Sequence, residues 1–175
     1  MGAGHGPDGP DRGTVRGLLE ATEVVSWSAR LAELGIELPA VAAPLAAYVP
    51  AVQSGSQVYV SGQLPFVNGT LAATGKVGAE ISPEEGKAHA RTCALNALAA
   101  VHNLVGIDSV VRVVKVGGFV AAAEGFTAVP AVINGASELF GEVFGEAGTH
   151  ARAAVGVAEL PLGAPVEVEV IFEVG

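Results

Sequence analysis

The nine residues before the C-terminal glycine constrain the fold more than any other segment of the chain. From 166 to 174 the apolar residues Val166, Val168, Val170 and Phe172 alternate with Glu167, Glu169 and Glu173, and Ile171 falls on the glutamate side. Successive side chains of a β-strand point to opposite faces of the sheet. This period of two therefore predicts a strand with one apolar face.

Two upstream segments predict long helices. Ser82-Pro83-Glu84-Glu85 has the pattern of a capping box with proline at the first helical position, and it predicts a helix to about Val105. The expected apolar face of this helix carries Ala90, Ala94, Ala97, Val101 and Leu104. A second long helix is expected from Thr127 to about Phe144.

The remaining segments predict strands, a loop and a short helix. Residues 110–120 are β-branched and nearly continuously apolar, which predicts a strand buried on both faces. We also expect a strand pair over 48–60 that turns at Ser54-Gly55, a loop over 66–78, and a strand over 153–160. A short helix is expected to begin at the N-cap Ser26 and to end at Gly35.

The order of these elements is strands, helix, strand, helix, strands. This order indicates an α+β sandwich in which two long helices pack on one face of a mixed β-sheet. The length of 175 residues suits a single domain, which we expect to span 26–175, with 26–40 as an N-terminal helical extension. Glycine, proline and aspartate dominate the first thirteen residues, and we expect residues 1–25 to form a flexible tail.

The chain is poor in charged residues. Asp, Glu, Lys and Arg make up 15% of it and hydrophobic residues 50%, whereas soluble domains average about 25% charged residues. Two interpretations follow: a membrane protein, or a soluble protein that buries part of its surface against copies of itself. The membrane interpretation fails, because charged residues, glycine and proline interrupt every apolar run before the about 20 residues of a spanning helix.

Charge and cysteine content narrow the partners and the compartment. Eighteen acidic and nine basic residues give a net charge of −9. This sign disfavours a nucleic-acid partner, because neutralising phosphates requires positive charge. Cys93 is the single cysteine and the N-terminus lacks the pattern of a signal peptide, so we expect a cytoplasmic protein without a disulfide.

Three short motifs resemble known sites but fail in detail. Gly75-Lys76 stands where a phosphate loop ends, but Val77 replaces the required serine or threonine. Ser137 lies within a predicted helix, whereas a nucleophile elbow needs a strand-to-helix turn. His89 and Cys93 share one helix face, but no further cluster completes a set of ligands, so we expect no metal.

Arg152 stands alone among small and apolar residues at the entry to a predicted strand. A guanidinium group does not lose its charge, so its burial requires an anionic partner. One interpretation is an ion pair with a strand glutamate such as Glu167. The other is a bidentate clamp for a substrate carboxylate, with each charge-assisted hydrogen bond contributing about 1.5–3 kcal/mol.

Segments at three places in the chain match one family pattern. The first place comprises 151–157, Leu160-Pro161 and 166–169. The second comprises Tyr48-Val49 and 60–65. The third is 132–136, at the start of the second long helix. In this order and spacing they resemble the reactive-intermediate deaminases, the RidA/YjgF family, over most of residues 45–174. The additional N-terminal segment marks a divergent, longer member.

The resemblance implies a chorismate mutase-like fold, assembly as a homotrimer and sites in the clefts between subunits. Members of the family hydrolyse reactive enamines and imines, such as 2-aminoacrylate, to a 2-oxo acid and ammonia, without a cofactor or metal. The implied partners are further copies of this chain and a small imine or enamine that carries a carboxylate. The alternative is a non-catalytic trimer that binds small carboxylates or a partner protein through the same clefts.

Carried over position by position, the resemblance implies that Arg152 clamps the substrate carboxylate. Glu167 would orient or deprotonate the attacking water, and Tyr48, Ser61 and Asn134 would line the cleft. Each of these residues also has a structural interpretation. Tyr48 could be an interfacial aromatic residue, Ser61 part of a turn and Asn134 a bridge to backbone groups, while Glu167 could simply neutralise Arg152.

Two positions beside Arg152 depart from the family pattern. The family usually has proline or a small residue two positions before the arginine, where this chain has His150. A cysteine commonly follows two positions after it, where this chain has Ala154. Because the family uses that second position largely through its backbone, Ala154 is still expected to bind substrate in a reshaped pocket. His150 is either a rim residue or a group that contributes a proton near neutral pH.

Overall fold

A five-stranded mixed sheet forms the centre of the protein. The computed structural model describes residues 1–3, 26–41 and 47–175, so the predicted tail lies almost wholly outside the described residues. The strand order is β1-β2-β7-β5-β6, with bounds Ala51–Ser54 (β1), Gln57–Gln63 (β2), Val110–Ala121 (β5), Ala151–Val157 (β6) and Val166–Val174 (β7). Strands β5 and β6 are parallel, and the other neighbours are antiparallel.

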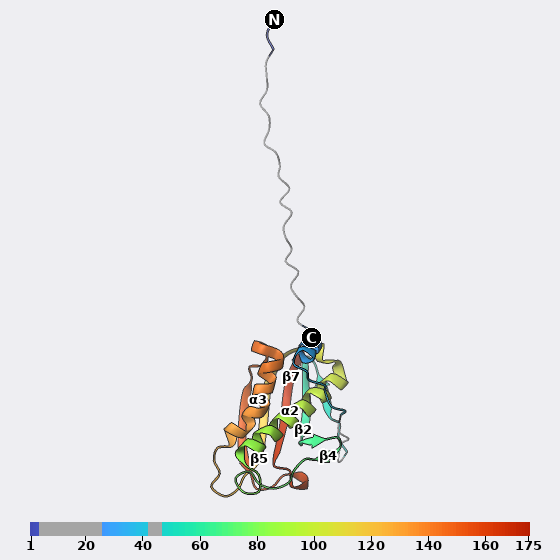
Figure 1. The fold of residues 1–175 in the computed structure, drawn as a ribbon. Helices are drawn as coiled ribbons and strands as arrows, with labels where there is room; N and C mark the ends of the chain where they lie inside the picture. The colour runs from blue at the N-terminus through green and yellow to red at the C-terminus, as the bar shows by residue number, and fades with distance from the viewer. Residues whose placement is uncertain (4–25, 42–46) are drawn as a thin grey trace.

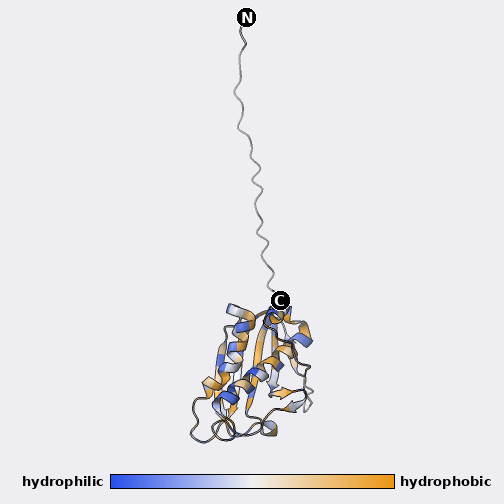
Figure 2. Ribbon diagram, in the orientation of Figure 1, coloured by the Kyte–Doolittle hydropathy of each residue, from blue (hydrophilic) through white to orange (hydrophobic). Residues whose placement is uncertain are grey.

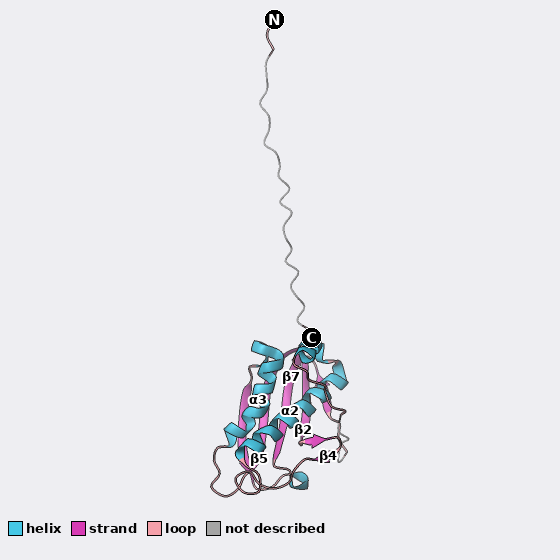
Figure 3. Ribbon diagram, in the orientation of Figure 1, coloured by secondary structure: helices cyan, strands magenta, loops and turns pink. Residues whose placement is uncertain are grey.

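Two long helices cover one face of this sheet, as the sequence predicted (Figure 1). They are α2, Pro83–Val105, and α3, Val129–Phe144. Helix α2 begins with the predicted capping box: Ser82 Oγ accepts from Glu85 N at 3.1 Å, and the Glu85 carboxylate accepts from Ser82 N at 2.7 Å. The α+β class and the two-layer arrangement are therefore confirmed, and Figure 3 shows the helix layer lying over the sheet.

The core lies between the helices and the sheet. On β7 the alternation is confirmed, since Val166, Val168, Val170 and Phe172 are buried and Glu167, Glu169 and Glu173 are not. Figure 2 shows the same division, with strands largely hydrophobic and both long helices carrying hydrophilic and hydrophobic residues in turn. On α2 the predicted apolar face is buried except at its end, where Leu104 is 43% exposed and that prediction is wrong.

A short helix, α1 at Trp27–Glu33, begins at the N-cap Ser26 as predicted. The Trp27 indole donates to the Val110 carbonyl at 2.7 Å, and its ring packs edge-on against Phe144 at 5.1 Å between centroids. The Asp108 carboxylate accepts from both the backbone amide and the hydroxyl of Ser28. These contacts fasten the segment to the ends of the sheet and of α3.

Two strand predictions and one loop prediction need correction. Strand β5 is not buried on both faces, because Val111, Arg112 and Lys115 are exposed on the side away from the helices. Strand β6 covers 151–157 instead of 153–160, because it follows its parallel partner β5. The expected loop over 66–78 contains a hairpin, β3 at Phe66–Val67 and β4 at Thr70–Leu71, whose Asn68-Gly69 turn has positive φ at both residues.

No described element covers the second face of the sheet, which we call the open face. The strand registers place Val52, Tyr59, Ile171, Lys115 and Ala151 in one row across it. Val52 and Tyr59 are 51% and 44% exposed, and Val155 on the same face is 46% exposed. The open face thus carries exposed apolar side chains between charged ones, and such exposed apolar groups are typical of a surface that meets another protein.

Candidate functional site

The candidate site residues fall into two groups in the structure. Arg152, Asn134 and Ala154 lie on the helix side of the sheet, where β6 runs along α3. Tyr48, Ser61 and Glu167 lie around β1, β2 and β7, at the other side of the molecule. The sheet separates the two groups.

Arg152 lies on the edge strand β6 and is held by side chains of α3. Its Nη1 atom donates to Asn134 Oδ1 at 2.8 Å and to Ser137 Oγ at 3.2 Å. Asn134 and Ser137 are three residues apart on a helix and therefore share a face. Among the described residues Arg152 forms no ion pair, so both of its recorded partners are neutral and the guanidinium charge is not compensated by them.

His150 extends this network. Its Nδ1 atom lies 2.6 Å from the Gly148 carbonyl oxygen and its Nε2 atom 2.8 Å from Ser137 Oγ. A carbonyl oxygen only accepts hydrogen bonds, so Nδ1 carries a proton. In the neutral ring Nε2 therefore accepts from the Ser137 hydroxyl. The Phe140 ring and the imidazole form an edge-to-face pair with 6.0 Å between ring centroids.

Ala154 stands two residues beyond Arg152 on the same side of β6. It pairs with Gly118 of β5 and packs against the core with its methyl group half-buried. It brings no polar side chain to the site. Any contribution of this position must come from its backbone or from the space that a methyl group leaves.

Glu167 is half-buried on the open face, directly over Gly62 of β2. A Cβ at Gly62 would overlap with the Glu167 carboxylate, so the glycine provides the seat for this group. Burial raises the pKa of the Glu167 carboxyl group, and the negative charge of Glu169, two residues along the same strand, raises it further. A carboxyl group with a raised pKa is suited to accept or donate a proton nearer neutral pH.

Ser61 and Tyr48 lie near this seat. Ser61 Oγ donates to the Val49 carbonyl at 2.6 Å, and its backbone amide donates to the Pro50 carbonyl at 2.9 Å. Ser61 also lines a hollow of about 280 Å³ on the open face together with Lys115 and Glu169. Tyr48 is 47% exposed in the segment that leads into β1.

Arg152 and Glu167 do not meet within one chain. Strand β5 lies between β6 and β7. Arg152 pairs with Val116, whose side chain is buried against the helices, whereas Glu167 pairs with Phe119. Because three residues separate Val116 from Phe119, their side chains point to opposite faces. The interpretation that Glu167 neutralises Arg152 in a structural ion pair is therefore wrong for the single chain.

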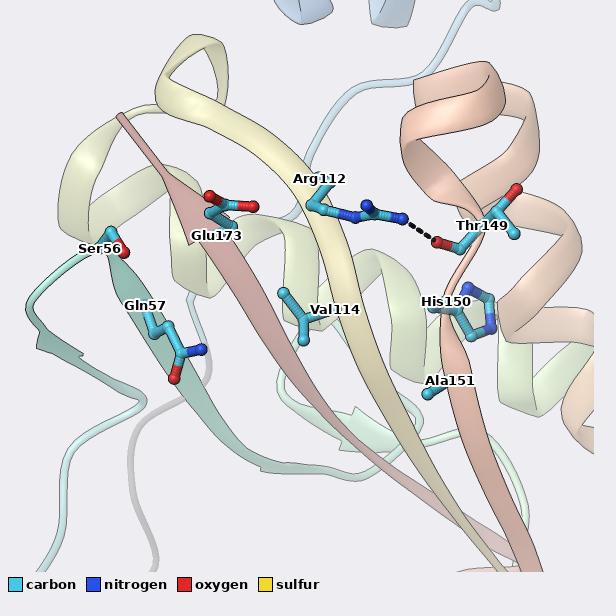
Figure 4. A pocket seen from close by; sticks show the side chains of 8 residues that line it. All are labelled: Ser56, Gln57, Arg112, Val114, Thr149, His150, Ala151 and Glu173. Carbon is cyan, nitrogen blue, oxygen red and sulfur yellow. Dashed lines mark hydrogen bonds between the residues drawn. The ribbon is translucent and has the colours of Figure 1, made fainter.

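The pocket in Figure 4 lies where β2, β5, β7 and the start of β6 come together. Its volume is about 450 Å³, and Ser56, Gln57, Arg112, Val114, Thr149, His150, Ala151 and Glu173 line it. Arg112 Nη2 donates to the Thr149 carbonyl at 3.2 Å. The His150 ring and the Ala151 methyl group leave the chain on opposite sides (Figure 4). His150 thus lines this pocket and also contacts Ser137.

Metal binding finds no support among the described residues, where no group of three or more His, Cys, Asp or Glu side chains is placed to hold an ion. Cys93 packs in the core, as expected, and its thiol lies 3.6 Å from the Val166 carbonyl. Burial, followed by the negative charge of Glu167, raises the pKa of the Cys93 thiol well above its ordinary value. Within the described part of the chain, no helix combines the length and apolar character needed to cross a bilayer.

Sequence reasoning missed the contribution of Ser137 and left the position of His150 open. The spacing of Asn134 and Ser137 was a usable signal, because residues three apart on a helix lie on one face. Gly62 gave no signal in the sequence. A glycine is needed there because β2 and β7 bring it against Glu167, and this contact depends on a break in the register of the two strands between Val60 and Gln63.

Known proteins similar to this chain point to one family. A model of the family described as "YjgF/chorismate mutase-like, putative endoribonuclease" matches residues 28–174. Protein TCP17 of Trypanosoma cruzi is 49% identical over 148 residues, which cover 83% of this chain and 92% of that protein.

Two solved structures extend the comparison. Atu1372 from Agrobacterium tumefaciens, described as of unknown function, superposes with a TM-score of 0.79 at 44% identity, covering 85% of this chain and 92% of that one. RidA from the Antarctic bacterium Psychrobacter sp. PAMC 21119 superposes with a TM-score of 0.56 at 32% identity, covering 77% and 94%. With a family match over most of its length, the chain belongs to the YjgF/chorismate mutase-like (RidA) family.

Proposed function

We propose that this protein hydrolyses small reactive imines or enamines that carry a carboxylate, such as 2-aminoacrylate, to a 2-oxo acid and ammonia. The observation that carries the proposal is the arrangement of Arg152. Its guanidinium is exposed at a sheet edge and held by two neutral acceptors, Asn134 and Ser137. A positioned guanidinium of this kind can bind a carboxylate through its remaining N–H groups. The similarity to RidA supports the same assignment.

Glu167 is the proposed acid–base group. An imine carbon is already electrophilic, so the protein has to position water, transfer a proton and stabilise charge. Water adds to the carbon, and the nitrogen takes up protons and leaves as ammonia. A carboxyl group with a raised pKa, as burial and Glu169 produce at Glu167, is suited to pass the proton between water and the leaving nitrogen.

We further propose that the site is completed by another copy of the chain, in a homotrimer. Arg152 and Glu167 lie on opposite faces of one sheet, so a small ligand contacts both only if they come from different chains. The exposed apolar side chains of the open face, Val52, Tyr59 and Val155, offer a surface for that association. Light scattering should give three times the chain mass of 17.4 kDa, and a monomer mass at assay concentration would refute the shared site.

A coupled assay tests the activity. A dehydratase generates 2-aminoacrylate, and the release of 2-oxo acid is followed with and without the protein. We expect acceleration by the wild type, loss of acceleration in Arg152→Ala, and partial loss in Arg152→Lys, because lysine keeps the charge but lacks the planar fork. Arg91→Lys is the matched control, since among the described residues the Arg91 side chain bonds Glu142 on the helix surface.

The same experiment separates the alternatives. Carboxylate binding without acceleration would indicate a non-catalytic small-carboxylate module, and full activity in Arg152→Ala would refute the proposed clamp. The ribonuclease activity named in the family description is not our proposal. The net charge of −9 repels the phosphates of a nucleic acid.

A further inference from the structure

The network beyond Arg152 has a single direction of donation. Arg152 Nη1 donates to Ser137 Oγ, the Ser137 hydroxyl donates to His150 Nε2, and His150 Nδ1 donates to the Gly148 carbonyl. The direction is set at its end, because the carbonyl oxygen of Gly148 only accepts. Hydrogen bonds in such a chain polarise and strengthen one another.

Protonation of His150 would reverse the middle link. An imidazolium ring donates from both nitrogens, so Nε2 would then donate to Ser137 Oγ. The hydroxyl hydrogen must turn away from His150, and it cannot point at Arg152 Nη1, which is also a donor. It is then available to a group that approaches beside the guanidinium. A carboxylate bound by Arg152 is such a group.

We propose that Ser137 and His150 are positioning residues of the Arg152 anion site, and that proton uptake by His150 converts the Ser137 hydroxyl into an additional donor for a bound carboxylate. The inference rests on the proposed function only in that Arg152 binds a carboxylate. The site therefore binds carboxylates more tightly at lower pH. Histidine is the side chain whose ordinary titration range makes this change available between pH 5 and 8.

The charges around His150 are few. Strand β6 contributes Arg152, which reaches the ring through Ser137. Strands β5 and β7 contribute Arg112 and Glu173, which line the same pocket as His150, and the turn before Thr149 carries the exposed Glu146. Helix α3 presents Ser137 and the Phe140 ring to the imidazole, while its nearest acid in sequence, Glu138, pairs with Lys87.

Arg112 and Glu173 carry opposite charges, so they oppose each other in their effect on an imidazolium. Of the charges near His150, the positive charge of Arg152 is therefore the one that a bound carboxylate neutralises most directly. A carboxylate at Arg152 offsets the repulsion between the guanidinium and a protonated His150. By reciprocity, the proton and the carboxylate then favour each other's binding.

Pyruvate binding by calorimetry between pH 5.5 and 7.5 tests the proposal, with pyruvate as a probe of the 2-oxo acid class. One additional hydrogen bond to a charged carboxylate predicts that wild-type affinity rises about 10- to 100-fold toward the lower pH. His150→Gln should bind with the wild-type affinity of pH 7.5 at both pH values. Ser137→Ala should lose most of the rise. His102→Gln, a change at an exposed histidine of α2, is the control and should keep it.

A spectroscopic readout of the His150 ring guards against a merely structural effect. The chain has four histidines, and comparison with His150→Gln assigns the His150 ring signals in nitrogen-15 NMR spectra. We expect the Nδ1–H tautomer at neutral pH and an upward move of the ring's titration midpoint when pyruvate saturates the site. Thermal unfolding of each variant confirms that it is folded.

The outcomes separate this proposal from the proposed function. An affinity equal at both pH values, a pH effect that survives in His150→Gln, or an Nε2–H tautomer would overturn the relay and leave the hydrolase proposal standing. A pH-dependent affinity without imine hydrolysis would support the relay and overturn the hydrolase. Failure of pyruvate to bind at any pH would overturn both.

Discussion

Gly62→Ala should displace the carboxylate of Glu167 and leave the fold intact. A Cβ at Gly62 would lie 2.9 Å from Glu167 Cδ, whereas carbon atoms in contact are about 3.5–4.0 Å apart. Glu167 Oε1 would lie closer still to this Cβ, so the carboxyl group must withdraw by more than about 1 Å. Glu167 can give way because the carboxyl group is the end of a flexible side chain, and the backbone of Gly62 does not have the left-handed φ that would strain an alanine.

The expected effects on stability and on activity differ in size. Moving Glu167 off its preferred rotamer costs about 0.5–1.5 kcal/mol, while replacing glycine by alanine restricts the unfolded chain and returns about 0.4–1 kcal/mol. The free energy of unfolding should thus change by less than about 1 kcal/mol. A catalytic group misplaced by about 1 Å lowers the rate on the order of 10²-fold. We therefore expect a nearly unchanged Tm and about 100-fold lower activity.

The release of 2-oxo acid from 2-aminoacrylate measures the activity, and thermal unfolding measures the stability. Gly117→Ala is the matched control, because its Cβ would lie 2.8 Å from Glu169 Cγ and so displaces the neighbouring carboxylate. This control should retain most of the activity. Wild-type activity in Gly62→Ala, or an equal loss in Gly117→Ala, would refute the assignment of the acid–base role to Glu167.

Three further changes test the electrostatics and the packing. Glu167→Gln should stabilise the protein at pH 7. The raised pKa of Glu167 means that the folded state holds the carboxyl proton more tightly than the unfolded state does. The protonated carboxyl group therefore contributes stability at low pH, and this contribution is lost as pH rises through the folded pKa. The advantage in Tm should shrink toward pH 4, and an advantage that grows there would contradict the direction of the shift. Gly135→Ala should lower the free energy of unfolding by about 1–3 kcal/mol in a urea titration, because its Cβ would overlap with the Lys87 carbonyl of α2. Gly141→Ala is the control: Gly141 lies on the same helix, its Cβ would meet open space, and the change should not destabilise the protein. Ser82→Ala should cost about 1 kcal/mol in the same titration through loss of the α2 N-cap, and an unchanged midpoint would argue against the capping box.

Most secondary structure was predictable because its signals are local. The capping box at Ser82 begins α2, the alternation over 166–174 gives β7, and Ser26 begins α1. The hairpin at Asn68-Gly69 was also predictable, since an Asn-Gly pair suits the turn with positive φ at both positions. Its two flanking strands are too short to show a period of two, which is why a loop was expected over 66–78.

The exposure of β5 was not predictable from its composition. A β-branched run is typical of a strand buried on both faces, but no described element covers the open face where Val111 and Lys115 lie. Whether that face meets another copy is a question of assembly, which the low charge content already raised.

The sequence by itself determined the elements, the apolar face of the sheet and the set of candidate residues, because capping, periodicity and family pattern depend on neighbours along the chain. Only the tertiary structure decided how those residues meet. The parallel pairing of β6 with β5 brings Arg152 beside α3, and the break in register between β2 and β7 puts Gly62 beneath Glu167. Both depend on contacts between segments remote in sequence, so no local pattern could have shown that Arg152 connects through Ser137 to His150, or that Glu167 lies across the sheet from it.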